Sequence, residues 1–282
     1  MLDKEVLVVP VVTGTISLVV AIVGYVGGYL LSNEVQTTND LVTYAEAGAL
    51  DGLSAITYTV WIATSAILAL LSTYTLAAVV SISLQRLRGE DPTIRSGLAR
   101  VQQKFGALTA FGLLSFGIVQ ALQIIQDRLP FIGGRIVAFL GEMAWRVAAF
   151  FAVPIIVDND QSIGPFTAAK QSLSTIRRTW KEAAVSQFGI GFVIMLVAFA
   201  EIFVGMISIF LAVSVAGTAG GVVIGILVGL LLLVTMLVSS VLTGIARAAL
   251  YYFASTGEAP ASFDKQLLRE AFTAKKARKI FS

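Results

Sequence analysis

Apolar residues dominate this chain in six long runs, which short polar or charged stretches separate. A helix needs about 20 mostly apolar residues to cross the roughly 30 Å hydrocarbon core of a bilayer. Six runs reach that length, at about 6–32, 54–84, 105–126, 135–157, 185–213 and 221–253. The pattern predicts an all-α, polytopic bundle of six transmembrane helices within residues 1–253, followed by a basic amphipathic tail over residues 254–282.

The basic residues are distributed very unevenly between the polar stretches. Residues 85–104, 158–184 and the tail from 254, together with Lys4, hold 16 of the 20 lysines and arginines, whereas residues 33–53 hold four acids and no base. Short loops rich in lysine and arginine stay on the cytoplasmic side. We therefore expect both termini to be cytoplasmic. The first run lacks a signal-peptide cleavage pattern, so we expect it to remain as an anchor.

The composition supports a membrane protein and removes several kinds of chemistry. Apolar residues make up 57% of the chain and charged residues 13%, about half the charged fraction of a typical soluble domain. The chain contains no cysteine and no histidine. Disulfides, thiol nucleophiles, Cys/His zinc sites and Ser-His triads are therefore excluded. We expect no catalytic residue, no cofactor and no metal site.

Basic amphipathic stretches follow the second, fourth and sixth runs. Each contains an acid and a proline and then a pattern with apolar residues on one helix face, such as Leu98, Val101 and Phe105 or Leu173, Ile176 and Trp180. We expect these stretches to lie in the headgroup plane against anionic lipid. Solvated connectors and packing against a protein partner are the alternatives. The residues predicted to face lipid in the second stretch are Lys170, Leu173, Arg177, Arg178, Trp180 and Lys181.

Two segments carry a resemblance to known proteins. They are AFFAVPIIVDNDQSIGPFTAAKQSLSTIRRTW, from residue 149, and ALYYFASTGEAPASFDKQLLREAF, from residue 249. They resemble a family of uncharacterised prokaryotic multi-pass membrane proteins, defined only as a domain of unknown function. The layout is also similar, more distantly, to the membrane domains of glycerophosphodiester phosphodiesterases. The features that match are Pro154, Asp158, Ala168, Lys170, Ser172 and Trp180. The resemblance implies a six-helix protein of a prokaryotic cell membrane, and it brings no activity and no catalytic residue to carry over.

Three ionisable residues stand out inside the predicted spans. Glu142 and Arg146 share one helix face, and Glu201 is predicted at a similar depth in the next span. A charge at the centre of a bilayer costs about 2.5 to 3.5 kcal/mol on insertion scales. We expect Arg146 to bridge the two glutamates as a structural clamp between helices. The alternatives are a proton or ion relay, and a pair that snorkels to the bilayer surface or faces another subunit.

Small residues and acids form two further patterns. Four glycines recur at every fourth position, which predicts a helix-packing face, or glycine zipper, either within the chain or between copies; they are Gly217, Gly221, Gly225 and Gly229. Gly24 and Gly28 are a candidate partner face. Asp158 and Asp160 form a D-x-D pair, for which helix N-terminal capping is the preferred explanation over metal binding.

The leading functional hypothesis is a non-enzymatic membrane scaffold or an organiser of lipids and proteins. Its expected partners are anionic lipid headgroups and other membrane proteins or further copies of the chain. The first alternative is a small transporter or channel component that uses Glu142, Arg146 and Glu201, and an enzyme acting on lipids is the third hypothesis. No P-loop or aromatic-interleaved basic stripe is present in the sequence, so nucleic acid is not expected as a partner.

Overall fold

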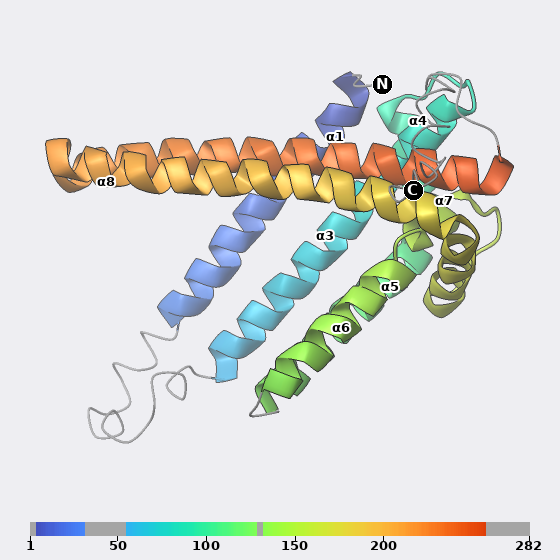
Figure 1. The fold of residues 1–282 in the computed structure, drawn as a ribbon, viewed down its shortest axis with the longest axis horizontal. Helices are drawn as coiled ribbons and strands as arrows, with labels where there is room; N and C mark the ends of the chain where they lie inside the picture. The colour runs from blue at the N-terminus through green and yellow to red at the C-terminus, as the bar shows by residue number, and fades with distance from the viewer. Residues whose placement is uncertain (1–3, 32–54, 129–131, 258–282) are drawn as a thin grey trace, which may run out of the picture.

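The computed structural model describes residues 4–31, 55–128 and 132–257, and these residues contain helices and turns but no strand (Figure 1). The predicted loop over 33–53 and most of the predicted tail lie outside the described residues. The elements are α1 (Lys4–Ala21) with a π-helical turn (Ile22–Val26), α3 (Ala55–Leu87), α4 (Ile94–Gln103), α5 (Phe105–Arg128), α6 (Ile132–Ala148), α7 (Ala152–Asp158) and α8 (Pro165–Thr256).

The long helix α8 folds back on itself at Gly217. This residue has a φ of +67°, a left-handed conformation that glycine adopts without steric cost. Residues before the turn lie against residues after it, as the close approach of Gly205 to Val228 and of Gly221 to Val213 shows. Figure 1 shows the two parts running side by side. We call residues 193–216 the first limb and residues 218–256 the second limb. The predicted seven-residue connection over 214–220 is thus a turn centred on one glycine.

Five helices of the described chain are long and apolar enough to cross a membrane, namely Val6–Leu31, Ile56–Leu87, Phe105–Gln126, Gly133–Asp158 and Val193–Thr256. The last has 64 residues and would be about 96 Å long if straight, three times the thickness of a hydrocarbon core. The turn at Gly217 divides it into its two limbs. The structure therefore confirms an all-helical protein with long apolar helices.

The predicted fourth span is broken into two helices, α6 and α7. Pro154 lacks the N–H that would continue the hydrogen-bond ladder, and its ring disfavours an unbroken helix through the preceding turn. The break falls over residues 149–151, and the backbone N–H of Phe151 donates instead to the Oγ of Ser172, at 2.9 Å. The side chain of Phe151 is fully buried there.

The apolar core is concentrated around α7, whose side chains from Ala152 to Val157 are all buried. The C-terminal half of α3, the start of α8 and its second limb contribute residues such as Val79, Ile176 and Val241, and α1, α4 and α5 also supply buried side chains. In contrast, the first limb and the middle of the second limb are largely exposed, as lipid-facing helices are expected to be. The packed end of the molecule is thus the end where α3, α7 and the second limb terminate.

The predicted glycine face packs over part of its length. A Cβ atom on Gly221 would lie 2.4 Å from Cγ2 of Val213, and one on Gly225 would lie 4.0 Å from Cδ1 of Ile209. Gly217 forms the turn, and nothing lies within 4 Å of a Cβ on Gly229. The partner surface is the first limb of the same helix. The prediction that Gly24 and Gly28 supply it is wrong, because they pack on Thr64 and Trp61 of α3.

The two ends of the glycine face should therefore respond differently to the same substitution. Gly221→Leu is expected to lower the free energy of unfolding by about 1 kcal/mol, since the added side chain pushes the limbs apart. Gly229→Leu has the same chemistry and open space around it, so it should leave stability unchanged. Thermal unfolding of both variants in one detergent measures the difference. Equal melting temperatures for the two variants would remove the packing role of Gly221.

Candidate functional site

The structure brings two of the three predicted intramembrane charges together. Arg146 donates from Nε to Oε1 of Glu142 at 3.2 Å, one helical turn away on α6, and its side chain is 77% exposed. Glu201 lies on the first limb of α8 and accepts a hydrogen bond from Oγ1 of Thr235, on the second limb, at 2.6 Å. Within the described part of the chain, Arg146 forms no ion pair with Glu201. The predicted three-residue clamp is thus two separate polar contacts.

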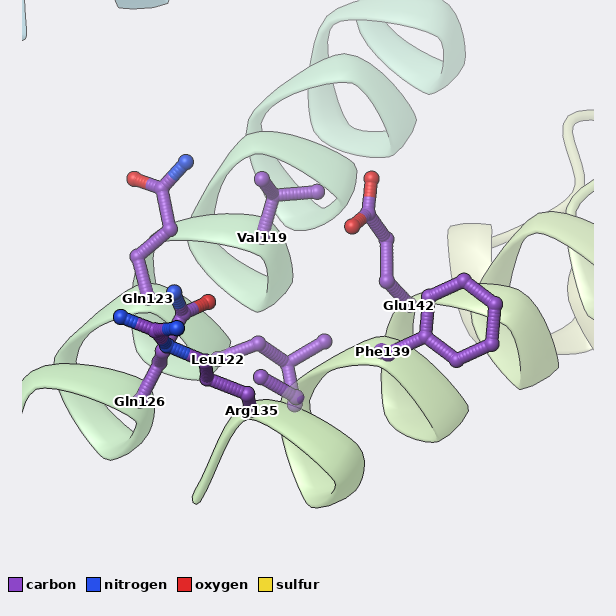
Figure 2. A pocket seen from close by; sticks show the side chains of 8 residues that line it. Val119, Leu122, Gln123, Gln126, Arg135, Phe139 and Glu142 are labelled. Carbon is purple, nitrogen blue, oxygen red and sulfur yellow. The ribbon is translucent and has the colours of Figure 1, made fainter. Parts of the chain in front are cut away.

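Glu142 also lines a small pocket between α5 and α6, which Figure 2 shows from close by. The pocket has a volume of about 150 Å³, the size of a cavity that holds a benzene-sized guest. Its polar lining consists of Gln123, Gln126, Arg135 and Glu142. Figure 2 shows Arg135 near the two glutamines and Glu142 at the opposite end. Arg146 and Glu201 do not line it, so this pocket connects to one of the three predicted charges.

A more enclosed polar cluster lies where three helices end. The guanidinium of Arg88, just after α3, donates from Nη2 to Oδ1 of Asp158, the last residue of α7. The hydroxyl of Tyr251, on the second limb of α8, donates to Oδ2 of the same carboxylate at 3.1 Å. Only 16% of the Asp158 side chain is exposed. One carboxylate thus ties α3, α7 and α8 together, and we call these three residues the Asp158 cluster.

Two cations from α4 and the residue after it cover the C-terminal end of α7 beside this cluster. Arg100 donates from Nε to the carbonyl oxygen of Val157 at 3.2 Å and from Nη2 to Oδ1 of Asp160 at 3.3 Å. The buried Lys104 donates from Nζ to the carbonyl oxygens of Asp160 and Gln161, at 2.9 and 3.3 Å. Cations are favourable at this end of a helix because its unpaired carbonyl groups carry partial negative charge.

Asp158 and Asp160 are therefore each held by an arginine. The prediction that they cap the next helix is wrong, since α8 begins after Gly164 without a side-chain cap and Asp158 ends α7. The described residues hold no group of three or more acidic, histidine or cysteine side chains placed to bind a metal ion. The side chain of Asp158 instead joins the end of α7 to the end of α3 and to α8, and that of Asp160 joins the segment after α7 to α4.

The segment with the resemblance folds around this junction. Ala168 and Ser172, in the first turns of α8, are fully buried, and Ser172 receives the Phe151 N–H at the break before α7. Pro154 lies within α7, and Asp158 ends it. A protein-family model described as a family of unknown function, DUF6159, matches residues 55–261, which is most of the chain. The chain belongs to the DUF6159 family. No curated protein and no solved structure matches it.

The DUF6159 match begins with α3, so it leaves out α1 and includes the whole Asp158 cluster. It names no activity, substrate or partner. A pocket of about 360 Å³ opens beside the cluster, between the end of α3 and α4, and Arg88, Arg100, Gln103 and Asp158 contribute to its polar lining. Both arginines are already paired with aspartates, so this pocket lies among residues that hold the helix ends together.

The stretches predicted to lie on lipid are partly folded into the protein. In α4 the side chain of Val101 is buried against the core, while Leu98 is 46% exposed. At the start of α8, Ile176 is buried, Leu173 is partly exposed and Lys170 is exposed. The side chains of Arg177, Arg178, Trp180 and Lys181 lie outside the described ones. The expectation of a wholly lipid-facing apolar stripe is therefore wrong for Val101 and Ile176.

The sequence pattern does not single out two residues of the Asp158 cluster. Arg88 is one of several basic residues in a polar stretch, and Tyr251 lies within an apolar run. The hydrogen bonds of Asp158 join residues 70 and 93 positions apart. An acid at the end of a fully apolar helix was the available signal, because such a carboxylate needs a partner.

Proposed function

We propose that this DUF6159 protein is a non-enzymatic, multi-pass organiser of lipids or protein partners at the cytoplasmic face of a prokaryotic cell membrane. The observation that carries the proposal is the mutual pairing of the polar groups at the packed end. Asp158 is held by Arg88 and Tyr251, and Asp160 is held by Arg100. Such pairing suits a rigid platform, whereas an acid or base in catalysis needs a group that can exchange its proton with a substrate.

Six membrane crossings with both termini cytoplasmic are the topology we propose for this platform. The Asp158 cluster supports it, since the ends of α3, α7 and the second limb of α8 meet at one carboxylate. The ends of these three helices lie at the ends of the second, fourth and sixth apolar runs. The turn at Gly217 supplies the extra crossing by returning the chain after the first limb.

Single cysteines test this topology cleanly, because the chain has none of its own. Gln102 and Lys170 have exposed side chains on the basic side, and Asp40 lies in the acidic stretch of the sequence. An impermeant thiol reagent added to intact cells is expected to label Asp40→Cys and to leave Gln102→Cys and Lys170→Cys unlabelled until the cells are opened. Labelling of Lys170→Cys in intact cells would contradict the proposed orientation.

Exposed apolar and basic side chains around the packed end suit contact with a membrane surface. Leu98, Phe105 and Phe166 are 46%, 58% and 69% exposed, and Arg95 and Lys170 are exposed nearby in sequence. Apolar side chains inserted between headgroups, with basic ones beside anionic lipid, are the usual features of an interfacial helix. We include interfacial placement of α4 and the start of α8 in the proposal.

Isolation from native membranes in a mild detergent, followed by identification of the lipids and proteins that remain bound, tests the organiser role. A specific, stoichiometric partner is expected to stay with the protein. The partner should be lost when Leu98 and Phe166 are both changed to serine and retained when Leu113, an exposed residue of α5, is changed. Monodisperse protein with neither bound lipid nor a bound protein would contradict the proposal.

A small transporter or channel component is the second candidate function. Glu142 favours it, because this carboxylate lines the pocket between α5 and α6 together with Arg135 and two glutamines. In reconstituted vesicles, a pH-dependent or ion-dependent flux that Glu142→Gln abolishes would support transport. Absence of such a flux in the parent protein would remove this candidate.

A further inference from the structure

The guanidinium of Arg247 has no anionic partner in the described part of the chain. It lies on the second limb of α8, its central carbon is 5.1 Å from the ring centroid of Phe150, and its Nε is enclosed without a hydrogen-bond partner. Buried polar groups are nearly always hydrogen-bonded, so an unmatched arginine requires an explanation. The residue as a whole is partly exposed, so the outer end of the side chain reaches the surface.

None of the described acids pairs with Arg247. Tyr251, one helical turn further along the same face, donates to Asp158, which also pairs with Arg88. Glu142 pairs with Arg146, and Glu201 accepts from Thr235. The positive charge of Arg247 is thus uncompensated by the described carboxylates, in contrast to the charge of Arg146.

The position of Arg247 along the limb matches the depth of lipid phosphates. It lies 30 residues after the turn at Gly217, which is about 45 Å at 1.5 Å per residue. A bilayer is about 40 to 45 Å thick when its headgroup regions are included. With the turn at one surface, Arg247 therefore lies at the headgroup level of the opposite leaflet, which is cytoplasmic in the proposed topology.

The surroundings of Arg247 suit a lipid with its phosphate at the guanidinium. The Phe150 ring lies over one face of the guanidinium, so hydrogen bonds to its N–H groups must form in the plane, the geometry in which arginine binds phosphate. Three turns deeper on the same helix face, Met236 is 71% exposed, so acyl chains can lie along this surface. A soluble anion gains nothing from that apolar surface, whereas a phospholipid does.

We propose that Arg247, supported by Phe150, binds the phosphate of an anionic phospholipid in the cytoplasmic leaflet. This site relies on the proposed topology for the leaflet and gives the proposed lipid-organising role a definite ligand. It does not depend on a protein partner being found.

The test measures the full-length protein, delipidated in maltoside detergent, by its melting temperature as phosphatidylglycerol is added. Phosphatidylglycerol is expected to raise the melting temperature, whereas inorganic phosphate at equal concentration should not. Arg247→Gln should weaken the apparent affinity for phosphatidylglycerol about ten- to hundredfold, the usual effect of losing hydrogen bonds from a charged group. Arg247→Lys keeps the charge without the planar fork and should show a smaller loss, which guards against a variant that fails to fold.

Arg146→Gln is the matched control, because it removes an arginine charge from another apolar span and leaves Arg247 intact. Its melting temperature should rise with added phosphatidylglycerol as that of the parent protein does. Parental affinity in both Arg247 variants would overturn the proposal, as would an equal loss in Arg146→Gln. A shift with inorganic phosphate equal to that with phosphatidylglycerol would identify a soluble anion as the ligand and overturn the lipid assignment. Lipid binding through Arg247 without any bound protein would keep this site while limiting the organiser role to lipids.

Discussion

Replacing Asp158 by asparagine is expected to lower the free energy of unfolding by about 2 to 3 kcal/mol. The substitution keeps the size of the side chain but removes the negative charge. The carboxylate oxygens that carry this charge accept hydrogen bonds from Arg88 and from the hydroxyl of Tyr251. Hydrogen bonds to charged groups contribute about 1.5 to 3 kcal/mol each. The loss stays below the sum of two such bonds, because Arg88 is 40% exposed and regains contact with water. Unfolding in mixed detergent micelles measures the change.

An exposed arginine–aspartate pair, Arg86 with Asp91, provides the control. Arg86 and Asp91 lie 3.7 Å apart, and the side chain of Asp91 is fully exposed. Asp91→Asn should therefore leave stability close to that of the parent. A double-mutant cycle between Arg88→Met and Asp158→Asn should give a coupling energy of about 1 kcal/mol or more, and the same cycle at Arg86 and Asp91 should give almost none. Equal coupling in the two pairs would show that the Asp158 cluster is no stronger than a surface contact.

Removing the hydroxyl of Ser172 should have a comparable effect. Ser172 is fully buried, and its Oγ accepts the N–H of Phe151 at the break between α6 and α7. Ser172→Ala leaves that N–H without a partner in an apolar environment, which costs about 1 to 3 kcal/mol. The matched change is Ser174→Ala, two residues along the same helix, where the hydroxyl is exposed and donates to the carbonyl oxygen of Gln171. Ser174→Ala should therefore have the same free energy of unfolding as the parent. A similar loss of stability in both variants would show that Ser172 has no special role.

The positions of the helices could be predicted from the sequence because each apolar run is much longer than any run in a soluble core. The predicted third span, 105–126, coincides with the apolar part of α5, and the second differs from α3 by a few residues. Counting apolar residues is sufficient here, because lipid requires the backbone to satisfy its own hydrogen bonds within each helix.

Pairings between distant segments could not be predicted in the same way. Helical periodicity places Glu142 beside Arg146, and the structure has that contact. Matching depths suggested Glu201 as a further partner, but depth says nothing about which way a helix face turns. The turn at Gly217 sets Glu201 opposite Thr235 instead. The break at residues 149–151 did have a local signal in Pro154, whose missing N–H and ring disfavour a continuous helix through the preceding turn.

The turn at Gly217 also bears on how the chain enters the membrane during synthesis. The residues around it, SVAGTAG over 214–220, carry no charge, in contrast to the four acids of residues 33–53. In the proposed topology, moving this turn across the hydrocarbon core requires no dehydration of an ionised side chain. Gly205 of the first limb and Gly221 of the second limb each pack closely against the facing limb. The two limbs of α8 can consequently enter the bilayer together as a helical hairpin, with the turn at Gly217 entering first.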